Sequence, residues 1–259
     1  MAVGRSLWVH TMFRDIGGLV MLFWRTLQAL PLAFRHRRKV LEQFYEVGMG
    51  SLLMVCILSF FIGGVLALEL GPVMVERGLA NYLGGIVGLG LCRELAPVLM
   101  AVLIAGRIGS AMAAEIGSMA VYQEIDALRT MNINPIHYLV LPRIIAIAVG
   151  LPMLLIFADL VGWMGGALVC STNQQIAVGM QSFMANLRAT VELQDVFHGL
   201  IKTFAFALII GTVSCHQGLA TIGGPRGIGR TVTKAVVNSI VLILILDYFL
   251  THLLVQLEQ

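Results

Sequence analysis

Five apolar stretches, each about as long as a bilayer is thick, constrain the fold of this chain more than any other feature. They cover residues 47–70, 83–106, 144–170, 196–216 and 235–255. A helix needs about 20 predominantly apolar residues to cross the hydrocarbon core of a membrane. Only 12% of the 259 residues are charged, which is too little polar surface for a soluble protein of this length. We therefore predict an all-α, polytopic membrane protein with five spans, in one domain covering residues 1–259.

Residues 1–46 are predicted to form an amphipathic helix that lies in the membrane interface. Arg5, Arg14 and Arg25 interrupt apolar residues that recur at helical spacing. A basic run at residues 35–39 follows and is typical of the cytoplasmic side. No uninterrupted apolar core precedes a small-residue cleavage site, so a signal peptide is not predicted. Nothing soluble accompanies the basic run, so we expect no nucleic-acid partner.

The connections between the spans differ in length and character. A turn is expected at Gly71–Pro72, followed by a short connection over residues 73–82. Residues 171–195 are polar and favour short helices, whereas the glycine-rich residues 217–230 favour a compact turn. The connection over residues 107–143 is the longest, and it holds the most informative segment of the chain.

Small residues recur at every fourth position from the second span onwards. They are Ala101, Ala105, Gly109, Ala113 and Gly117. Such a row lets another helix approach closely, and close approach is what drives helix association in lipid. Two interpretations remain open: the row packs against a helix of the same chain, or it contacts a second subunit. Ala105, Gly109 and Ala113 are the candidate packing and dimer residues.

Charged residues inside the spans are a sharper signal, because a charge in a bilayer needs a partner or a polar cavity. The second span contains Arg93 and Glu94, which point about 100° apart on a helix. One interpretation is a substrate cavity in which Arg93 attracts an anionic group and residues near the end of the first span form an apolar wall. The candidates for that wall are Leu66, Leu70 and Val73. The other is an ion-pair network with charges elsewhere in the chain: Glu69, Asp159, Lys202 or Asp247.

A short amphipathic helix is predicted over residues 118–134, in the connection between the second and third spans. Apolar residues repeat there at intervals of three, and charged residues flank them. The stripe comprises Met119, Tyr122, Ile125, Leu128 and Met131, and the flanking charges are Glu124, Asp126 and Arg129. The segment is too short and polar to span, and Pro135 is expected to end it. Such a helix suits docking into the groove of a partner protein.

Several kinds of chemistry are not indicated. The four cysteines are far apart and the histidines form no ligand pair, so no metal site or cofactor is predicted. Residues 224–231, GPRGIGRT, approach the spacing of a phosphate-binding loop. That motif works only between a buried strand and a helix, whereas these residues lie between two spans. No catalytic constellation is visible, so we expect a non-catalytic protein.

Three motifs together make the chain resemble the MlaE (YrbE) family of permeases. They are R-E-L-A-P from Arg93, A-G-R-I-G-S-A from Ala105, and E-I-D-A-L from Glu124. The resemblance extends from about Tyr45 into the final span and includes G-G-P-R-G-I-G-R. Members of this family are permease subunits of ABC transporters that move lipids between bacterial membranes.

The resemblance implies a homodimer in the bacterial inner membrane that carries phospholipid between the inner and outer membranes. Two cytoplasmic ATPase subunits and an extracytoplasmic MCE-domain protein would be its partners. By this likeness, Met119 to Met131 would be the coupling helix that meets the ATPase. Arg93 and Glu94 would lie near the lipid cavity at the dimer axis. The turn after Glu69 departs from the family pattern, which leaves the residues of the upper cavity open.

Two other function classes fit parts of the sequence. A stand-alone secondary transporter or channel would use the charges within the spans as an ion relay, but it would not need the amphipathic stripe and would be expected to show internal repeats. A structural anchor for other subunits is the third class. Association with an ATPase and dependence of transport on ATP separate the three.

The first prediction concerns topology. Thirteen of the 17 lysines and arginines fall in the N-terminal segment and in the connections 107–143 and 217–234, whereas only Arg77 and Arg188 lie in the opposite connections. The positive-inside rule therefore puts the N-terminus in the cytoplasm and the C-terminus in the periplasm. A reporter active only outside the cytoplasm should be active when fused to Gln259. A signal there from a cytoplasm-specific reporter would contradict the five-span topology.

Overall fold

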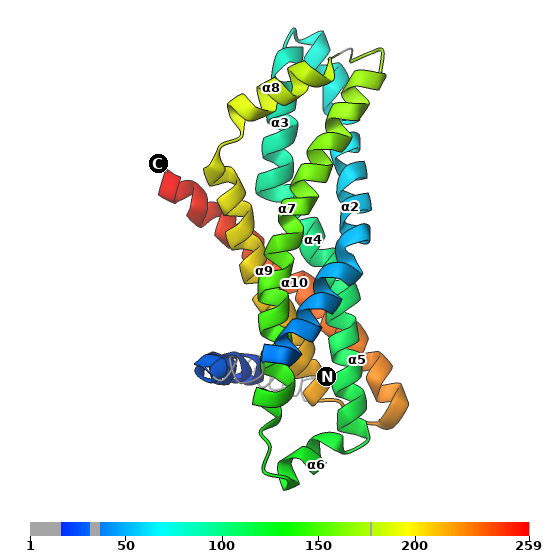
Figure 1. The fold of residues 1–259 in the computed structure, drawn as a ribbon, viewed down its shortest axis with the longest axis vertical. Coiled ribbons are helices and arrows are strands. Elements are labelled where there is room, and N and C mark those ends of the chain that lie inside the picture. Colours follow the sequence, from blue (N-terminus) through cyan, green and yellow to red (C-terminus); the bar gives the residue numbers. More distant parts are fainter. Residues whose placement is uncertain (1–16, 32–36, 177, 259) are drawn as a thin grey trace, which may run out of the picture. The chain divides into compact units, whose positions relative to one another are not determined.

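The computed structural model describes residues 17–31, 37–176 and 178–258, and these residues are almost entirely helical with no strand among them. Five helical segments are long and apolar enough to cross a membrane (Figure 1). They are Arg37–Glu76, Ala80–Val121, Ile136–Thr172, Leu193–Leu219 and Gly224–Leu257. Each contains one predicted span, so the prediction of an all-α protein with five membrane helices is confirmed.

A helix at residues 17–29 precedes nine helices that Figure 1 identifies by colour or label. These nine are α2 (Arg37–Glu76), α3 (Leu83–Gly90), α4 (Ala96–Ile104), α5 (Ser110–Val121), α6 (Glu124–Thr130), α7 (Leu141–Thr172), α8 (Met180–Thr190), α9 (Leu193–Leu219) and α10 (Gly224–Glu258). Short helical turns join some of them: the 3₁₀ turn η2 (Ala80–Tyr82) and the π-helical turns η3 (Leu91–Leu95), η4 (Ala105–Gly109) and η5 (Ile136–Val140).

Contacts divide the chain into two compact units, each assembled from three segments. The first unit comprises residues 1–44, 105–148 and 207–242. The second comprises residues 45–104, 149–206 and 243–259. Each unit is described by itself below.

The expected turn at Gly71–Pro72 is wrong, because α2 continues through both residues to Glu76. A proline in a helix removes one N–H donor, and long membrane helices tolerate this where neighbouring groups compensate. Gly71 is buried against the side chain of Ile176, which packs beside it. The chain turns only afterwards, at Gly78, whose φ of 72° is the left-handed conformation that glycine favours.

The expected glycine-rich turn over residues 217–230 is much shorter than predicted. Helix α9 continues to Leu219 and α10 begins at Gly224, so only four residues connect them. Gly223 and Gly224 have φ values of 92° and 68°, and they account for the turn. The rest of GPRGIGRT is helical from Gly224 onwards, so these residues do not form the extended loop between a strand and a helix that cradles a phosphate.

Close contacts between backbones hold the second unit together. A Cβ atom on Gly63 of α2 would collide with the carbonyl oxygen of Gly162 on α7, and the hydroxyl of Ser59 donates to the carbonyl of Ala158. Helix α3 packs equally closely on α8, where the N–H of Gly85 donates to the Asn186 side chain over 2.6 Å. Small residues thus pack α2 on α7 and α3 on α8 within one chain.

Helices α5, α7 and α9 form the centre of the first unit. Arg143 of α7 pairs with Glu115 of α5 at 2.7 Å. Gly218 of α9 lies against Ile116 of α5, and a Cβ atom there would be 2.8 Å from that side chain. Near the start of α2, the Lys39 ammonium lies 3.0 Å from the ring centre of Tyr138.

The row of small residues is buried within the chain itself. Ala105, Gly109 and Ala113 have no appreciable exposed surface. Further along α5, Gly117 lies against Thr221, next to α9. This placement supports packing against the same chain, and a contact of these residues with a second copy stays a prediction.

We predict that Gly63→Ala destabilises the protein, because the added methyl group meets backbone rather than a movable side chain. Overpacking of this kind costs roughly 1–3 kcal/mol, which should lower the melting temperature of the detergent-solubilised protein. Gly90→Ala is the matched control, because a Cβ atom on that helical glycine has open space around it. Equal melting temperatures for the two variants would show that the contact between α2 and α7 is looser than described.

Candidate functional site

Charged side chains gather in the second unit around the π-helical turn η3. This turn replaces α-helical geometry over Leu91–Leu95 and carries both Arg93 and Glu94. A π-turn inserts one extra residue into a helix, and such turns occur frequently at functional sites. The two adjacent charged side chains on this turn point in different directions and have different partners.

Arg93 pairs with Asp195 in the first turn of α9. The guanidinium donates from Nε and from a terminal nitrogen to Oδ1 of the carboxylate. The other oxygen, Oδ2, accepts the backbone N–H of Glu192 over 2.8 Å. Asp195 therefore also caps the start of α9, in the manner of a carboxylate reaching back to the N-cap residue. One buried carboxylate holds both a membrane helix end and the Arg93 side chain.

Glu94 takes part in a second group of polar contacts, centred on Lys202 of α9. The Lys202 ammonium lies 2.7 Å from Glu94 Oε2 and 3.2 Å from Asp247 Oδ1 of α10, and it donates to the backbone carbonyl of Arg93 over 3.0 Å. The Thr251 hydroxyl donates to the same glutamate over 3.3 Å. Only 1% of the Lys202 surface is exposed, so three oxygen partners replace the water that the ammonium would otherwise bind.

These contacts favour the interpretation in which Arg93 and Glu94 belong to an ion-pair network. Lys202 and Asp247, two of the expected partners, are part of that network. The partner of Arg93 was missed, because the sequence placed Asp195 in the connection before the fourth span. Helix α9 begins at Leu193, earlier than predicted, which brings Asp195 into the bundle. A carboxylate three residues after an N-cap is the sequence signal that indicates this earlier start.

The three apolar candidates for a cavity wall lie in different surroundings. Leu66 and Leu70 are partly buried and pack against an apolar cluster that includes Leu83 and Phe183. Val73 is 45% exposed. A lipid cavity that combines these three residues with Arg93 and Glu94 stays a prediction.

The predicted coupling helix at residues 118–134 is wrong in its bounds. Helix α5 continues to Val121, and α6 occupies only Glu124–Thr130. Between them Gln123 adopts a left-handed φ of 61°, which breaks the helix. Pro135 does not end this helix but begins the next one, where Asn134 Oδ1 accepts the N–H of Ile136 over 3.0 Å.

Because the helix breaks at Gln123, the five apolar residues do not form one stripe. Ile125 is buried, and Met119 and Leu128 pack against the same apolar cluster of the first unit. Tyr122 and Met131 point outwards, with 65% and 68% of their surface exposed. The charged residues of α6 are exposed as well, and Asp126 pairs with Arg129 over 3.1 Å. Figure 1 shows α6 in the connection between α5 and α7.

Five membrane helices, with paired charges within them and a short helix between two of them, are the architecture of a multi-pass membrane protein. The match to known proteins gives the family: residues 40–253 match the family described as Permease MlaE, and the chain belongs to this family.

Curated relatives agree with this assignment. The chain is 41% identical over 221 residues to a protein of Synechocystis sp. named probable ABC transporter permease protein, covering 85% of this chain and 83% of the relative. A protein of Rickettsia typhi with the same description is 40% identical over 215 residues, covering 83% and 82%. The chloroplastic protein TRIGALACTOSYLDIACYLGLYCEROL 1 of Arabidopsis thaliana is 35% identical over 221 residues, covering 85% and 63%. An ABC transporter permease works with ATPase partners.

We predict that Arg93→Met lowers the stability of the protein, because it strands the buried Asp195 carboxylate. Removing one partner of a fully buried pair costs roughly 3–5 kcal/mol. The loss should be smaller here because the Arg93 side chain is 35% exposed. Arg188→Met, which changes an exposed arginine on α8, is the control. The melting temperature and the phospholipid that co-purifies should both be measured. Unchanged melting with a loss of bound lipid would instead make Arg93 a lipid anchor.

Proposed function

We propose that the chain is the membrane subunit of an ATP-driven transporter that moves phospholipid between the inner and outer membranes of a bacterium. The observation that carries this proposal is the family match over residues 40–253, since that segment covers most or all of each of the five membrane helices. In this role the permease itself catalyses no reaction. ATP hydrolysis belongs to separate ATPase subunits, and the permease converts their movement into transport.

A glycerolipid substrate is supported by two independent features. The name of the Arabidopsis relative contains a galactosylated diacylglycerol, which is a glycerolipid. In this chain, Arg93 keeps 35% of its side chain exposed although it lies within a membrane helix. A guanidinium that remains accessible beside apolar helices suits the phosphate of a lipid whose acyl chains contact those helices.

The proposed assembly is a homodimer in the inner membrane, with two cytoplasmic ATPase subunits and an MCE-domain protein on the periplasmic side. Helix α10 supports a contact with another membrane component, because large apolar side chains such as Leu244, Tyr248 and Phe249 are exposed along it. Only 11% of the most apolar stretch of α10 is buried inside the chain. In a homodimer, a second copy of the chain would cover this exposed apolar face in place of lipid.

The short helix α6 is the proposed contact with the ATPase. Its inner side is anchored by Ile125 and Leu128, so the helix is fixed to the first unit. The outer side presents Tyr122 and Met131 next to Glu124, Asp126 and Arg129. Exposed aromatic and methionine side chains with a polar rim are typical of an interface core.

A secondary transporter is the competing function, and the charges around Lys202 are the observation that favours it. Carboxylates and amines within membrane helices can relay protons or ions. The two functions differ in their energy source. Purified protein with its ATPase, reconstituted between donor and acceptor vesicles, should move fluorescent phospholipid only when ATP is present and hydrolysable. Transport that continues without ATP but follows a proton gradient would refute the ABC permease function.

We predict that the double variant Tyr122→Ala and Met131→Ala weakens binding of the ATPase at least tenfold, because both side chains would be buried in the contact. The expected stability of the permease itself is unchanged, since neither side chain is buried in the chain. Tyr45→Ala removes an equally exposed tyrosine from α2 and is the matched control. The measurement is the amount of ATPase that co-purifies with the tagged permease. Full yield with the double variant would show that α6 is not the docking helix.

A further inference from the structure

A pocket of about 540 Å³ lies within the first unit. Three parts of the chain line it: the helix at residues 17–29, the segment from Arg129 in the last turn of α6 to His137, and the end of α9. Its volume lies within the range of pockets that bind small molecules in proteins. Of its lining residues, Arg129 also belongs to the proposed ATPase contact.

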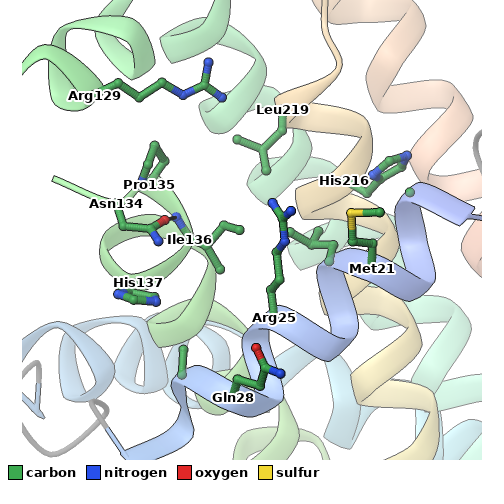
Figure 2. Close-up of a pocket in the computed structure, with 13 residues that line it drawn as sticks. Met21, Arg25, Gln28, Arg129, Asn134, Pro135, Ile136, His137, His216 and Leu219 are labelled. Carbon is green, nitrogen blue, oxygen red and sulfur yellow. Dashed lines mark hydrogen bonds between the residues drawn. The ribbon is translucent and has the colours of Figure 1, made fainter. Parts of the chain in front are cut away.

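The polar lining of the pocket is cationic or neutral. Arg25, Arg129, His137 and His216 contribute nitrogen atoms, and none of the lining residues is acidic. Figure 2 shows Arg25 among the labelled residues, with its guanidinium extending away from its own helix into the space between Ile136 and Leu219. Arg25 has no ion pair with any residue that the structure describes. Arg129 already pairs with Asp126, so among the described residues Arg25 is the lining guanidinium that has no carboxylate to accept from it.

The helix that carries Arg25 is suited to the surface of a membrane. Leu22, Thr26 and Ala29 are buried against the first unit, whereas Val20 and Trp24 are mostly exposed on the other side. An exposed apolar face on a helix with basic residues lies at the boundary between headgroups and acyl chains. Lipid phosphates occur at this depth, so Arg25 and the pocket are within their reach.

We infer that this pocket binds the phosphate of an anionic lipid headgroup from the leaflet in which the helix at residues 17–29 lies. Arg25 is the main ligand, because a guanidinium donates two parallel hydrogen bonds to a phosphate. Arg129 of α6, which also pairs with Asp126, and Asn134 of the segment that follows α6 add donors. The bound lipid joins the N-terminal helix to the segment next to the proposed ATPase contact. This site is distinct from the transport cavity and does not depend on which lipid is transported.

The test uses the full-length permease purified in neutral detergent and titrated with dioctanoyl phosphatidylglycerol, with bound lipid counted by native mass spectrometry. Dioctanoyl phosphatidylcholine and sodium phosphate are titrated in parallel. Arg25→Gln should weaken binding of phosphatidylglycerol about tenfold or more, as expected for the loss of a charge-assisted hydrogen-bond pair. Arg226→Gln is the matched control, because it removes an exposed arginine of the first unit that does not line the pocket.

A second variant and a positional measurement keep the result specific. Gln28→Glu places a carboxylate in the lining without removing an arginine, and it should weaken binding as Arg25→Gln does. A photoreactive phosphatidylglycerol should label peptides containing residues 129–137, and Arg25→Gln should abolish that labelling. If sodium phosphate competes at the same concentration as the lipid, the site binds phosphate and its natural ligand is the free anion. Equal weakening by Arg25→Gln and Arg226→Gln, or labelling confined to residues around Arg93, would overturn the inference.

Discussion

A charged group inside a bilayer needs a partner within the protein. This requirement explains how helices of the second unit are joined. Lys202 illustrates it, because its ammonium is almost completely buried and is surrounded by oxygen atoms from Glu94, Asp247 and the backbone of Arg93. These partners belong to η3 and α10, and they hold both elements to α9, which carries Lys202. Apolar side chains do not distinguish neighbouring helices from lipid, so ion pairs and close backbone contacts decide which helices pack together.

Breaks in helical geometry are as important as the ion pairs, because they occur at the two places where a function is proposed, the turn η3 and the short helix α6. The π-turn η3 sends Arg93 and Glu94 to different partners. Gln123 and Asn132 adopt positive φ values on either side of α6, which isolates that helix from α5 and from the start of the third span. The result is a short helix whose inner side is packed and whose outer side is free to meet another protein.

The ion pairs also limit how the proposed transport can work. Asp195 binds Arg93 and caps α9 at the same time, so a movement that releases Arg93 would also disturb the start of α9. A lipid phosphate that approaches Arg93 would compete with this carboxylate. If Arg93 binds the lipid as proposed, Asp195 links substrate binding to the position of α9.

Four properties could be predicted from the sequence alone: the number of membrane helices, the asymmetry of basic residues, the presence of a short helix between two spans, and the family. These properties follow from local composition and spacing, since hydrophobic length, charge counts and contiguous motifs need no knowledge of distant contacts. The sequence also marked Arg93, Glu94, Lys202 and Asp247 as charges that require partners.

The partners of these charged residues and the ends of the helices could not be predicted from the sequence and became clear only from the folded chain. Asp195 lies 102 residues from Arg93 along the chain, and no local pattern relates the two. Pro72 and Gly227 resemble turn residues, yet both are helical, because packing and the lack of water favour a continued helix over local preference. The stripe of five apolar residues around α6 was lost at Gln123, where one left-handed residue ended the periodicity. Pairings and helix ends depend on contacts between distant segments, and those contacts exist only in the folded chain.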